Sequence, residues 1–143
     1  RGETAMNALE EGSDLTLDFE KLLKIGRAEQ SVVPVVLQDA DSNEVLFVGF
    51  ANEEALRETL KHQRAVLWST SRNELWRKGD GSGDVLSLAE VCVNCEQNSL
   101  LYRVRREGGG ACHTLGAEGR SRGHCYYRRI IGSESAGWKL EPR

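Results

Sequence analysis

The chain has 143 residues, which fits one domain, and 39% of them are hydrophobic, which is enough for a single modest core. The formal net charge is -3 and the charged residues are mixed in sign, so we expect no basic face of the kind that binds nucleic acid. Apolar runs fall far short of the roughly 20 residues that span a bilayer, and the N-terminal region has no apolar signal core. These features predict a soluble, cytoplasmic protein that binds neither nucleic acid nor membrane.

The first predicted elements are an extension, a short helix and a hairpin. Residues 1–14 are polar and rich in small residues, and are expected to form a flexible N-terminal extension. Apolar residues from Leu15 to Ile25 predict a short strand or turn that leads into one or two helical turns. Val32–Gln38 and Glu44–Phe50 are both strand-like, and the turn residues between them complete a predicted β-hairpin.

The clearest predicted helix spans Glu53–Lys61. Asn52 is a suitable N-cap, acidic residues occupy the first turn, and a lysine lies in the last turn. A strand is predicted next, at Ala65–Ser69. The segment that follows, Thr70–Asp84, is rich in serine, glycine and charge, which is typical of a functional loop rather than of core.

Two further strand-like segments, Val85–Cys95 and Leu100–Arg106, predict a second antiparallel pair. A last strand is predicted at Cys125–Ile131, before a polar tail over residues 133–143. Together the elements indicate an α+β fold with a mostly antiparallel sheet and one main helix, in a single domain over residues 15–132.

All four cysteines lie in the C-terminal half of the chain. Cys92 and Cys95 have C-x-x-C spacing, but twelve residues separate Cys112 from Cys125, so only half of a zinc-ribbon pattern is present. In the predicted strand, Cys92 and Cys95 would point to opposite faces and could not share one ion. Cys95, Cys112 and Cys125 then remain as three ligands of a catalytic zinc with water as the fourth, and buried free thiols are the alternative.

The three histidines differ in their distance from these thiols along the chain. His113 directly follows Cys112, which suits a general acid or base beside a metal-bound water, because imidazole titrates near neutral pH. A surface histidine without a catalytic role is the alternative. His124, beside Cys125, is interpreted as an outer partner of a metal ligand or as an exposed residue, and His62 as a solvated one.

The segment from Trp68 to Gly83 combines hydroxyls, cationic side chains and glycines with two tryptophans. Such groups suit phosphate recognition, and a tryptophan can stack on a base. A solvated loop beside core tryptophans would have much the same composition. The candidate substrate-binding residues of this segment are Trp68, Ser69, Ser71, Arg72, Trp76 and Lys78.

Several motifs, taken in order from about residue 30 to residue 130, form a highly specific set. They are Val35-Val36-Leu37-Gln38-Asp39-Ala40, Asn52-Glu53-Glu54-Ala55-Leu56, Trp68-Ser69-Thr70-Ser71-Arg72, Leu75-Trp76, Lys78-Gly79, Ser82-Gly83, Cys95 with Leu100-Leu101, Ala111-Cys112-His113-Thr114 and Cys125-Tyr126-Tyr127. This ordered set resembles the phosphoribosyl-AMP cyclohydrolase family of histidine biosynthesis.

The resemblance implies a zinc-dependent hydrolase that acts in the third step of histidine biosynthesis. Water adds at C6 of the purine of 1-(5-phosphoribosyl)-AMP, and the N1 to C6 bond opens to give a phosphoribosylformimino imidazole carboxamide ribonucleotide. The resemblance also implies an intertwined homodimer, in which one subunit gives the zinc ligand that matches Cys95 and the other gives those that match Cys112 and Cys125. His113 would carry a proton to or from the ring.

One departure from the family pattern concerns a second metal. Relatives commonly carry alternating aspartates, associated with magnesium, at the positions of Asn94, Glu96 and Asn98. Magnesium favours carboxylate oxygens, so two neutral amides among three positions should weaken a magnesium site considerably.

The other departure is the spacing between Cys112 and Cys125, which is longer than in many relatives. Residues 115–122 therefore read as an inserted surface loop, which a chain absorbs easily. Arg120 and Arg122 of this loop are candidate phosphate contacts.

Two alternatives to the family's activity remain. A relative with the same zinc and hydrolytic groups but a different purine nucleotide substrate is the first, and the neutral amides motivate it. A zinc-stabilised binding module without catalysis is the second, and it predicts four sulfur ligands including Cys92.

Overall fold

The computed structural model describes residues 7–143. Its elements in chain order are α1 (Ala8–Glu11), α2 (Lys21–Arg27), β1 (Val33–Asp39), β2 (Val45–Ala51), α3 (Glu53–His62), β3 (Val66–Ser69), β4 (Glu74–Arg77), β5 (Leu86–Val93), β6 (Leu100–Arg106), β7 (Arg128–Ser133) and β8 (Gly137–Pro142). The fold is α+β, as predicted, with one main helix, α3. Within the described residues, no helix is long and apolar enough to cross a membrane.

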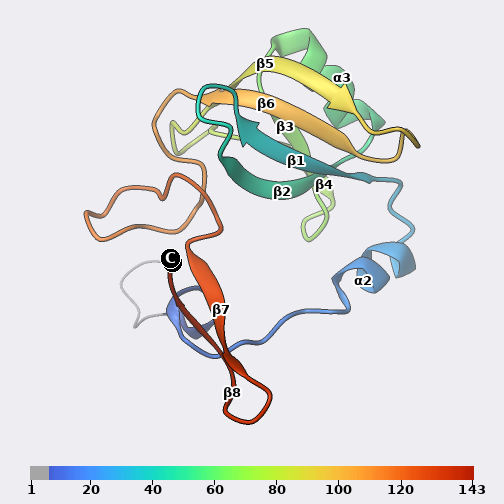
Figure 1. The fold of residues 1–143 in the computed structure, drawn as a ribbon. Helices are drawn as coiled ribbons and strands as arrows, with labels where there is room; N and C mark the ends of the chain where they lie inside the picture. The colour runs from blue at the N-terminus through green and yellow to red at the C-terminus, as the bar shows by residue number, and fades with distance from the viewer. Residues whose placement is uncertain (1–6) are drawn as a thin grey trace.

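Four strands form the main sheet, in the order β2-β1-β6-β5 (Figure 1). The pairs β1–β2 and β5–β6 are antiparallel, which confirms both predicted hairpins. The central pair, β1 with β6, is parallel, so the sheet is mixed rather than antiparallel throughout. This parallel pairing brings together two segments that are distant in sequence, and no local pattern indicates it.

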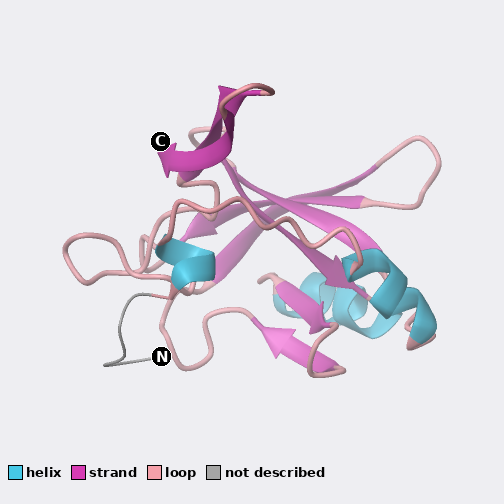
Figure 2. Cartoon of the chain, turned by 90° about the horizontal axis from the view of Figure 1, so that it is seen from below, coloured by secondary structure: helices cyan, strands magenta, loops and turns pink. Residues whose placement is uncertain are grey.

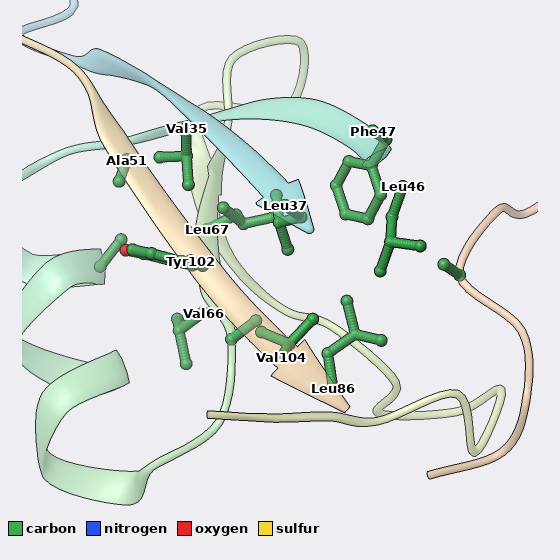
Figure 3. Packing of buried hydrophobic residues seen from close by; sticks show 13 residues of the cluster. Val35, Leu37, Leu46, Phe47, Ala51, Val66, Leu67, Leu86, Tyr102 and Val104 are labelled. Atoms are coloured by element: carbon green, nitrogen blue, oxygen red, sulfur yellow. The ribbon is translucent and has the colours of Figure 1, made fainter. Parts of the chain in front are cut away.

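The core lies between the main sheet and the layer formed by α3 and the β3–β4 hairpin. Alternate residues of β1 are buried, as period-2 packing requires, and Val35 and Leu37 are completely inaccessible. Figure 3 shows these side chains facing Leu67 of β3 and Tyr102 of β6. The core cluster consists of hydrophobic residues from five strands and α3, together with Ala65 and Ala111 from the adjoining loops, so this packing fixes where β2 and β3 lie.

Residues at its two ends determine where the helix α3 begins and ends. Asn52 is its N-cap, and the side-chain oxygen of Asn52 accepts a hydrogen bond from the backbone N–H of Ala55 at 2.9 Å. Gln63 ends the helix in the left-handed conformation, with φ of 56°. The buried hydroxyl of Thr59 accepts the backbone N–H of Val66, which ties α3 to β3.

One predicted loop contains a strand. Residues 70–84 were expected to be irregular, but Glu74–Arg77 forms β4 and pairs with β3. The reason is tertiary, because the ring of Trp76 packs against that of Phe47, with the two centroids 6.0 Å apart. The polar composition of the segment conceals this contact.

The strand predicted at Val85–Cys95 ends at Val93, so Cys95 lies in a turn. The side-chain oxygen of Asn94 accepts the backbone N–H groups of Asn98 and Ser99, both at 2.9 Å, and these bonds close the turn in place of further ladder pairing. The expectation that Cys95 continues the alternation of Cys92 along one strand is therefore wrong.

The two ends of the chain also differ from expectation. Residues 7–14 were predicted to be a flexible extension, but they form α1 and reach an isolated bridge between Asp14 and Lys139, while residues 1–6 lie outside the described part. The last strand starts at Arg128 rather than at Cys125, because the backbone N–H of Cys125 bonds to the carbonyl of Leu46. The polar tail forms β8, which pairs with β7 in a hairpin that stands apart from the main sheet (Figures 1 and 2).

Candidate active site

A cavity of about 900 Å³ opens between β2, the β3–β4 hairpin and the loop that follows β6. The residues predicted to bind substrate all line it, together with one predicted zinc ligand and the predicted proton carrier. These lining residues are Trp68, Ser69, Ser71, Arg72, Trp76, Lys78, Cys112 and His113. Positions that span 45 residues of sequence thus meet in one concave site.

The turn between β3 and β4 presents hydroxyls and a guanidinium to the cavity. The hydroxyl of Ser69 accepts the backbone N–H of Arg72 at 3.2 Å and lies 3.4 Å from the hydroxyl of Ser71. Asn73 has φ of 57°, and its N–H bonds to the carbonyl of Ser69 at 2.7 Å, which closes the turn. Hydroxyls and a cation on a compact turn suit a phosphate group.

The two tryptophans of the site are anchored differently. The indole N–H of Trp68 donates to the side-chain oxygen of Gln30 at 2.9 Å, and the side-chain amide of Gln30 donates to the carbonyl of Thr70 at 3.0 Å. Trp76 packs on Phe47 and has the ammonium of Lys78 at 5.9 Å from its ring centroid. Both rings are half-buried, and each keeps an edge in the cavity.

Lys78 is an unusual buried cation, with 5% of its surface exposed. Burial lowers the pKa of its ammonium, and the negative charges of Asp84 and of the Cys112–Cys125 thiol pair act in the opposite direction. Gly79, with φ of 95°, follows directly, and a Cβ there would lie 2.5 Å from the backbone of Val85. The chain can fold back against Lys78 only because this position is glycine.

Cys112 and Cys125 are brought together although twelve residues separate them. The inserted loop folds back on itself, because the N–H groups of Ala111 and Cys112 bond to the carbonyl of Arg122 and the N–H of Arg122 bonds to the carbonyl of Thr114. These hydrogen bonds hold Arg122, at the end of the loop, next to Ala111 and Cys112 at its beginning. The longer spacing therefore leaves the two thiols adjacent, as expected for an insertion absorbed at the surface.

The two thiols interact directly. A hydrogen bond from Cys125 lowers the pKa of Cys112 to about 5, and the hydroxyl and backbone N–H of Thr114 act in the same direction while burial opposes them. The same hydrogen bond raises the pKa of Cys125. The hydroxyl of Thr114 lies 3.0 Å from the sulfur of Cys112. Cys112 is readily ionised and Cys125 lies next to it, so the two sulfurs together are good ligands for a soft metal ion.

His113 extends outward beside this pair, with 70% of its side chain exposed. Its Nε2 atom makes a hydrogen bond with the carboxylate of Glu10 on α1. Sequence reasoning missed Glu10, since 103 residues separate the two and no motif surrounds the glutamate. His124 contacts Glu44 at 3.7 Å, and His62 contacts Glu58 at 3.4 Å, outside the cavity.

Cys95 is not near the other two predicted zinc ligands in this chain. It is exposed in the β5–β6 turn, at the end of the main sheet opposite the loop that carries Cys112 (Figure 1). Among the described residues, no group of three or more histidine, cysteine or acidic side chains could hold a metal ion within one chain. Cys92 is half-buried within β5, where it pairs with Leu101.

The predicted magnesium positions do not form a suitable donor set. Asn94, Glu96 and Asn98 are all exposed. The amide nitrogen of Asn94 donates to the side-chain oxygen of Asn98 at 2.6 Å, and the Asn94 oxygen already accepts two backbone N–H groups. Both amide oxygens are thus engaged in holding the turn, which does not fit a cation that prefers carboxylates.

Of the two loop arginines considered as phosphate contacts, Arg122 has another role. Its guanidinium makes two hydrogen bonds with the carboxylate of Glu11, at 2.8 and 2.9 Å, and stacks 3.7 Å from the ring centroid of Tyr127. This pairing with Glu11 raises the pKa of Arg122. Arg120 is exposed and does not line the cavity.

One further residue of the cavity wall was not anticipated. Asp84 is 7% exposed, and a Cβ at Gly108 or Gly110 would lie 2.8 or 3.0 Å from its carboxylate oxygen. The glycines at 108–110, which the sequence presents only as a break after β6, thus allow the backbone to pass close to this carboxylate.

Comparison with known proteins identifies relatives of the chain. The family model for phosphoribosyl-AMP cyclohydrolase matches residues 47–127. The phosphoribosyl-AMP cyclohydrolase of Bordetella parapertussis is 41% identical over 111 residues, which cover 77% of this chain and 78% of the relative. That of Archaeoglobus fulgidus is 42% identical over 106 residues, 74% of this chain and 92% of the relative. That of Ralstonia pickettii is 37% identical over 123 residues, 85% and 84% of the two chains.

Proposed function

This chain belongs to the phosphoribosyl-AMP cyclohydrolase family, and on that basis we propose that it opens the purine ring of 1-(5-phosphoribosyl)-AMP in histidine biosynthesis. The observation that carries the proposal is the cavity in which a hydroxyl-rich turn, a buried lysine and the Cys112-His113 pair converge. This arrangement combines groups for a phosphorylated nucleotide with groups for proton transfer and metal binding.

The phosphates of the substrate would meet the cationic and hydroxyl groups of the β3–β4 segment. Ser69, Ser71 and Arg72 lie together on one turn, and Lys78 lies further along the same wall. Burial strengthens the interaction of Lys78 with an anion because little water screens it. The exposed edge of Trp76 or Trp68 offers an apolar surface for the purine.

We propose that Cys112 and Cys125 hold zinc together with Cys95 of a second copy of the chain. The adjacent thiols fit a soft ion, and within one chain the third sulfur lies too far away, at the opposite end of the sheet. Bound zinc supplies hydroxide at neutral pH by lowering the pKa of water.

His113 would carry the proton of the reaction. The imidazole follows Cys112 directly and lines the cavity, so it lies beside the position where water attacks C6. It would accept one proton from that water and return it to N1 as the N1 to C6 bond breaks, while the second water proton passes from the C6 hydroxyl to the exocyclic imino nitrogen. C6 with its oxygen and exocyclic nitrogen then forms the carboxamide, and N1 carries an N–H. The proton count balances with no other donor.

A homodimer follows from the shared metal site, and the exposed apolar residues are consistent with it. Val93, beside the Cys95 turn, is 56% exposed, and Phe19, Leu22 and Trp138 are 88%, 68% and 51% exposed. Large apolar side chains on several separate elements are typical of an intertwined interface rather than of a monomer surface.

A subunit-mixing experiment tests the activity and the shared site together. Cys95→Ser and Cys112→Ser homodimers should each lose zinc and at least about 1,000-fold in kcat/KM for phosphoribosyl-AMP. When the two variants are unfolded together and refolded, half of the dimers are mixed and each carries one intact site, so about a quarter of wild-type activity should return. Cys92→Ser is the matched control and should keep its zinc.

Two outcomes contradict the proposal. Mixed dimers that stay inactive while each variant folds would show that the ligands are not shared between subunits. A zinc-loaded wild-type dimer that leaves phosphoribosyl-AMP unchanged but turns over another purine nucleotide would assign a different substrate.

A further inference from the structure

We infer that Glu10, on α1, is a positioning residue that holds His113 in the tautomer able to accept a proton from water. This inference deepens the proposed function and rests on the role given to His113 there. It concerns a part of the chain that precedes the matched family region, which begins at residue 47.

The contact between the two side chains is direct. A carboxylate oxygen of Glu10 meets Nε2 of His113, and 19% of the Glu10 side chain is exposed against 70% of the imidazole. The main chain of Glu10 is held as well, because its carbonyl accepts the hydroxyl of Tyr127 at 2.9 Å. The carboxylate is thus the fixed partner and the histidine the exposed one.

Several contacts fasten the helix α1 to the loop that carries the thiols and to β7. Glu11 pairs with Arg122 through two hydrogen bonds, and the guanidinium of Arg128 donates to the carbonyls of Gly12 and Leu9, both at 2.9 Å. The side chain of Asn7 caps α1 by accepting from Leu9 and Glu10. A helix of four residues would not persist alone, so these contacts are what place Glu10.

The chemical consequence follows from which nitrogen the carboxylate engages. A carboxylate only accepts hydrogen bonds, so neutral His113 must carry its proton on Nε2, and Nδ1 keeps a free lone pair. Nδ1 is then the atom that takes a proton from the attacking water. Without Glu10 the imidazole could exchange tautomers and rotate, since most of its surface faces solvent. The carboxylate therefore fixes both the proton and the direction of the ring.

The test uses the full-length zinc-loaded protein with Glu10→Gln, because glutamine fills the same space but can donate as well as accept. We expect kcat to fall about 10- to 100-fold with KM changed less than about twofold. In ¹⁵N NMR, the His113 nitrogens should move from the Nε2–H pattern of the wild type toward a mixture of tautomers. Glu10→Asp, which keeps a carboxylate, should recover part of kcat.

Glu118→Gln is the matched control, since it removes the same charge from an exposed position of the inserted loop. Zinc content and thermal stability of each variant separate positioning from folding. Unchanged kcat and unchanged His113 shifts in Glu10→Gln would overturn the inference, and so would a loss of kcat explained by lost zinc. The NMR comparison needs no substrate, so a failure of the proposed activity would remain distinguishable from a failure of this inference.

Discussion

The two walls of the cavity are built by different kinds of interaction. On one wall, β2 and the β3–β4 hairpin rest on apolar side chains that are almost completely buried, such as Leu67 and Leu46. On the other wall, the loop over residues 111–125 is held by main-chain hydrogen bonds and by ion pairs with α1. The first wall carries the groups proposed to bind phosphate, and the second carries those proposed for metal binding and proton transfer.

This difference has a physical consequence for how each wall responds to change. Buried apolar surface stabilises a fold strongly, and moderate salt changes this stabilisation little. The phosphate-binding wall should therefore lose its structure only when the whole domain unfolds. Partly exposed ion pairs are weak and screened by salt, so the wall with the thiols can open locally. We therefore expect substitutions in the first wall to change global stability more than activity, and substitutions in the second wall to change activity more than global stability.

The largest effect on stability is expected for Leu67→Ala. Leu67 has no exposed surface and lies in the core beside Leu37 of β1 and Gly49 of β2. Removing its side chain leaves a cavity, which should lower the free energy of unfolding by about 2–5 kcal/mol. Denaturant unfolding measures the loss, while kcat of the remaining folded protein should stay near that of the wild type. Leu60→Ala is the control, because Leu60 on α3 is 49% exposed, and it should change stability by less than about 0.5 kcal/mol.

Sequence patterns predicted the first wall better than the second. Period-2 alternation located β1, and the N-cap of Asn52 located α3, because both signals depend only on neighbouring residues. The strand β4 was missed because its packing on Phe47 depends on tertiary contact. The second wall rests on main-chain hydrogen bonds within its loop and on pairs such as Glu10 with His113, which local patterning does not reveal.

The candidate site shows the same limit. Motif resemblance pointed to the cavity residues individually, and the structure brings eight of them together. It could not indicate that Arg122 is engaged with Glu11, or that the Asn94 side chain closes its own turn. None of the motifs that carry the resemblance includes Glu11, Asn94 or Arg122, so neither contact could be read from them.

An intermediate effect is expected at Asp39, which lies where the two walls join. Its carboxylate accepts the N–H groups of Ser42 and Asp41 and lies 3.5 Å from Arg106, which in turn donates to the carbonyl of Gly123 in the second wall. Hydrogen bonding from Ser42 is the main cause that lowers the pKa of Asp39 below 3.8, although burial opposes it.

The sign of the pH dependence follows from that shift. The folded carboxyl binds a proton less readily than the unfolded one, so its contribution is complete above pH 3.8 and is lost as pH falls through the folded pKa. Asp39→Asn should therefore lower the unfolding free energy by about 1–2 kcal/mol at neutral pH and by much less at strongly acidic pH. A difference between the two proteins that stays constant with pH would exclude this role.

The smallest effect on global stability, and the most local one, is expected for Arg122→Gln. The Arg122 and Glu11 side chains are each 22% exposed, so this pair should contribute only about 1 kcal/mol, which high salt should reduce. Because the pair fastens α1, its loss should speed hydrogen exchange in residues 8–12 far more than in β1 or β6. If Glu10 positions His113 as inferred, kcat should fall with it, since the glutamate loses its anchor. Equal exchange rates in both proteins would mean that Tyr127 and Arg128 hold α1 without the ion pair, and the second wall would then be as firmly built as the first.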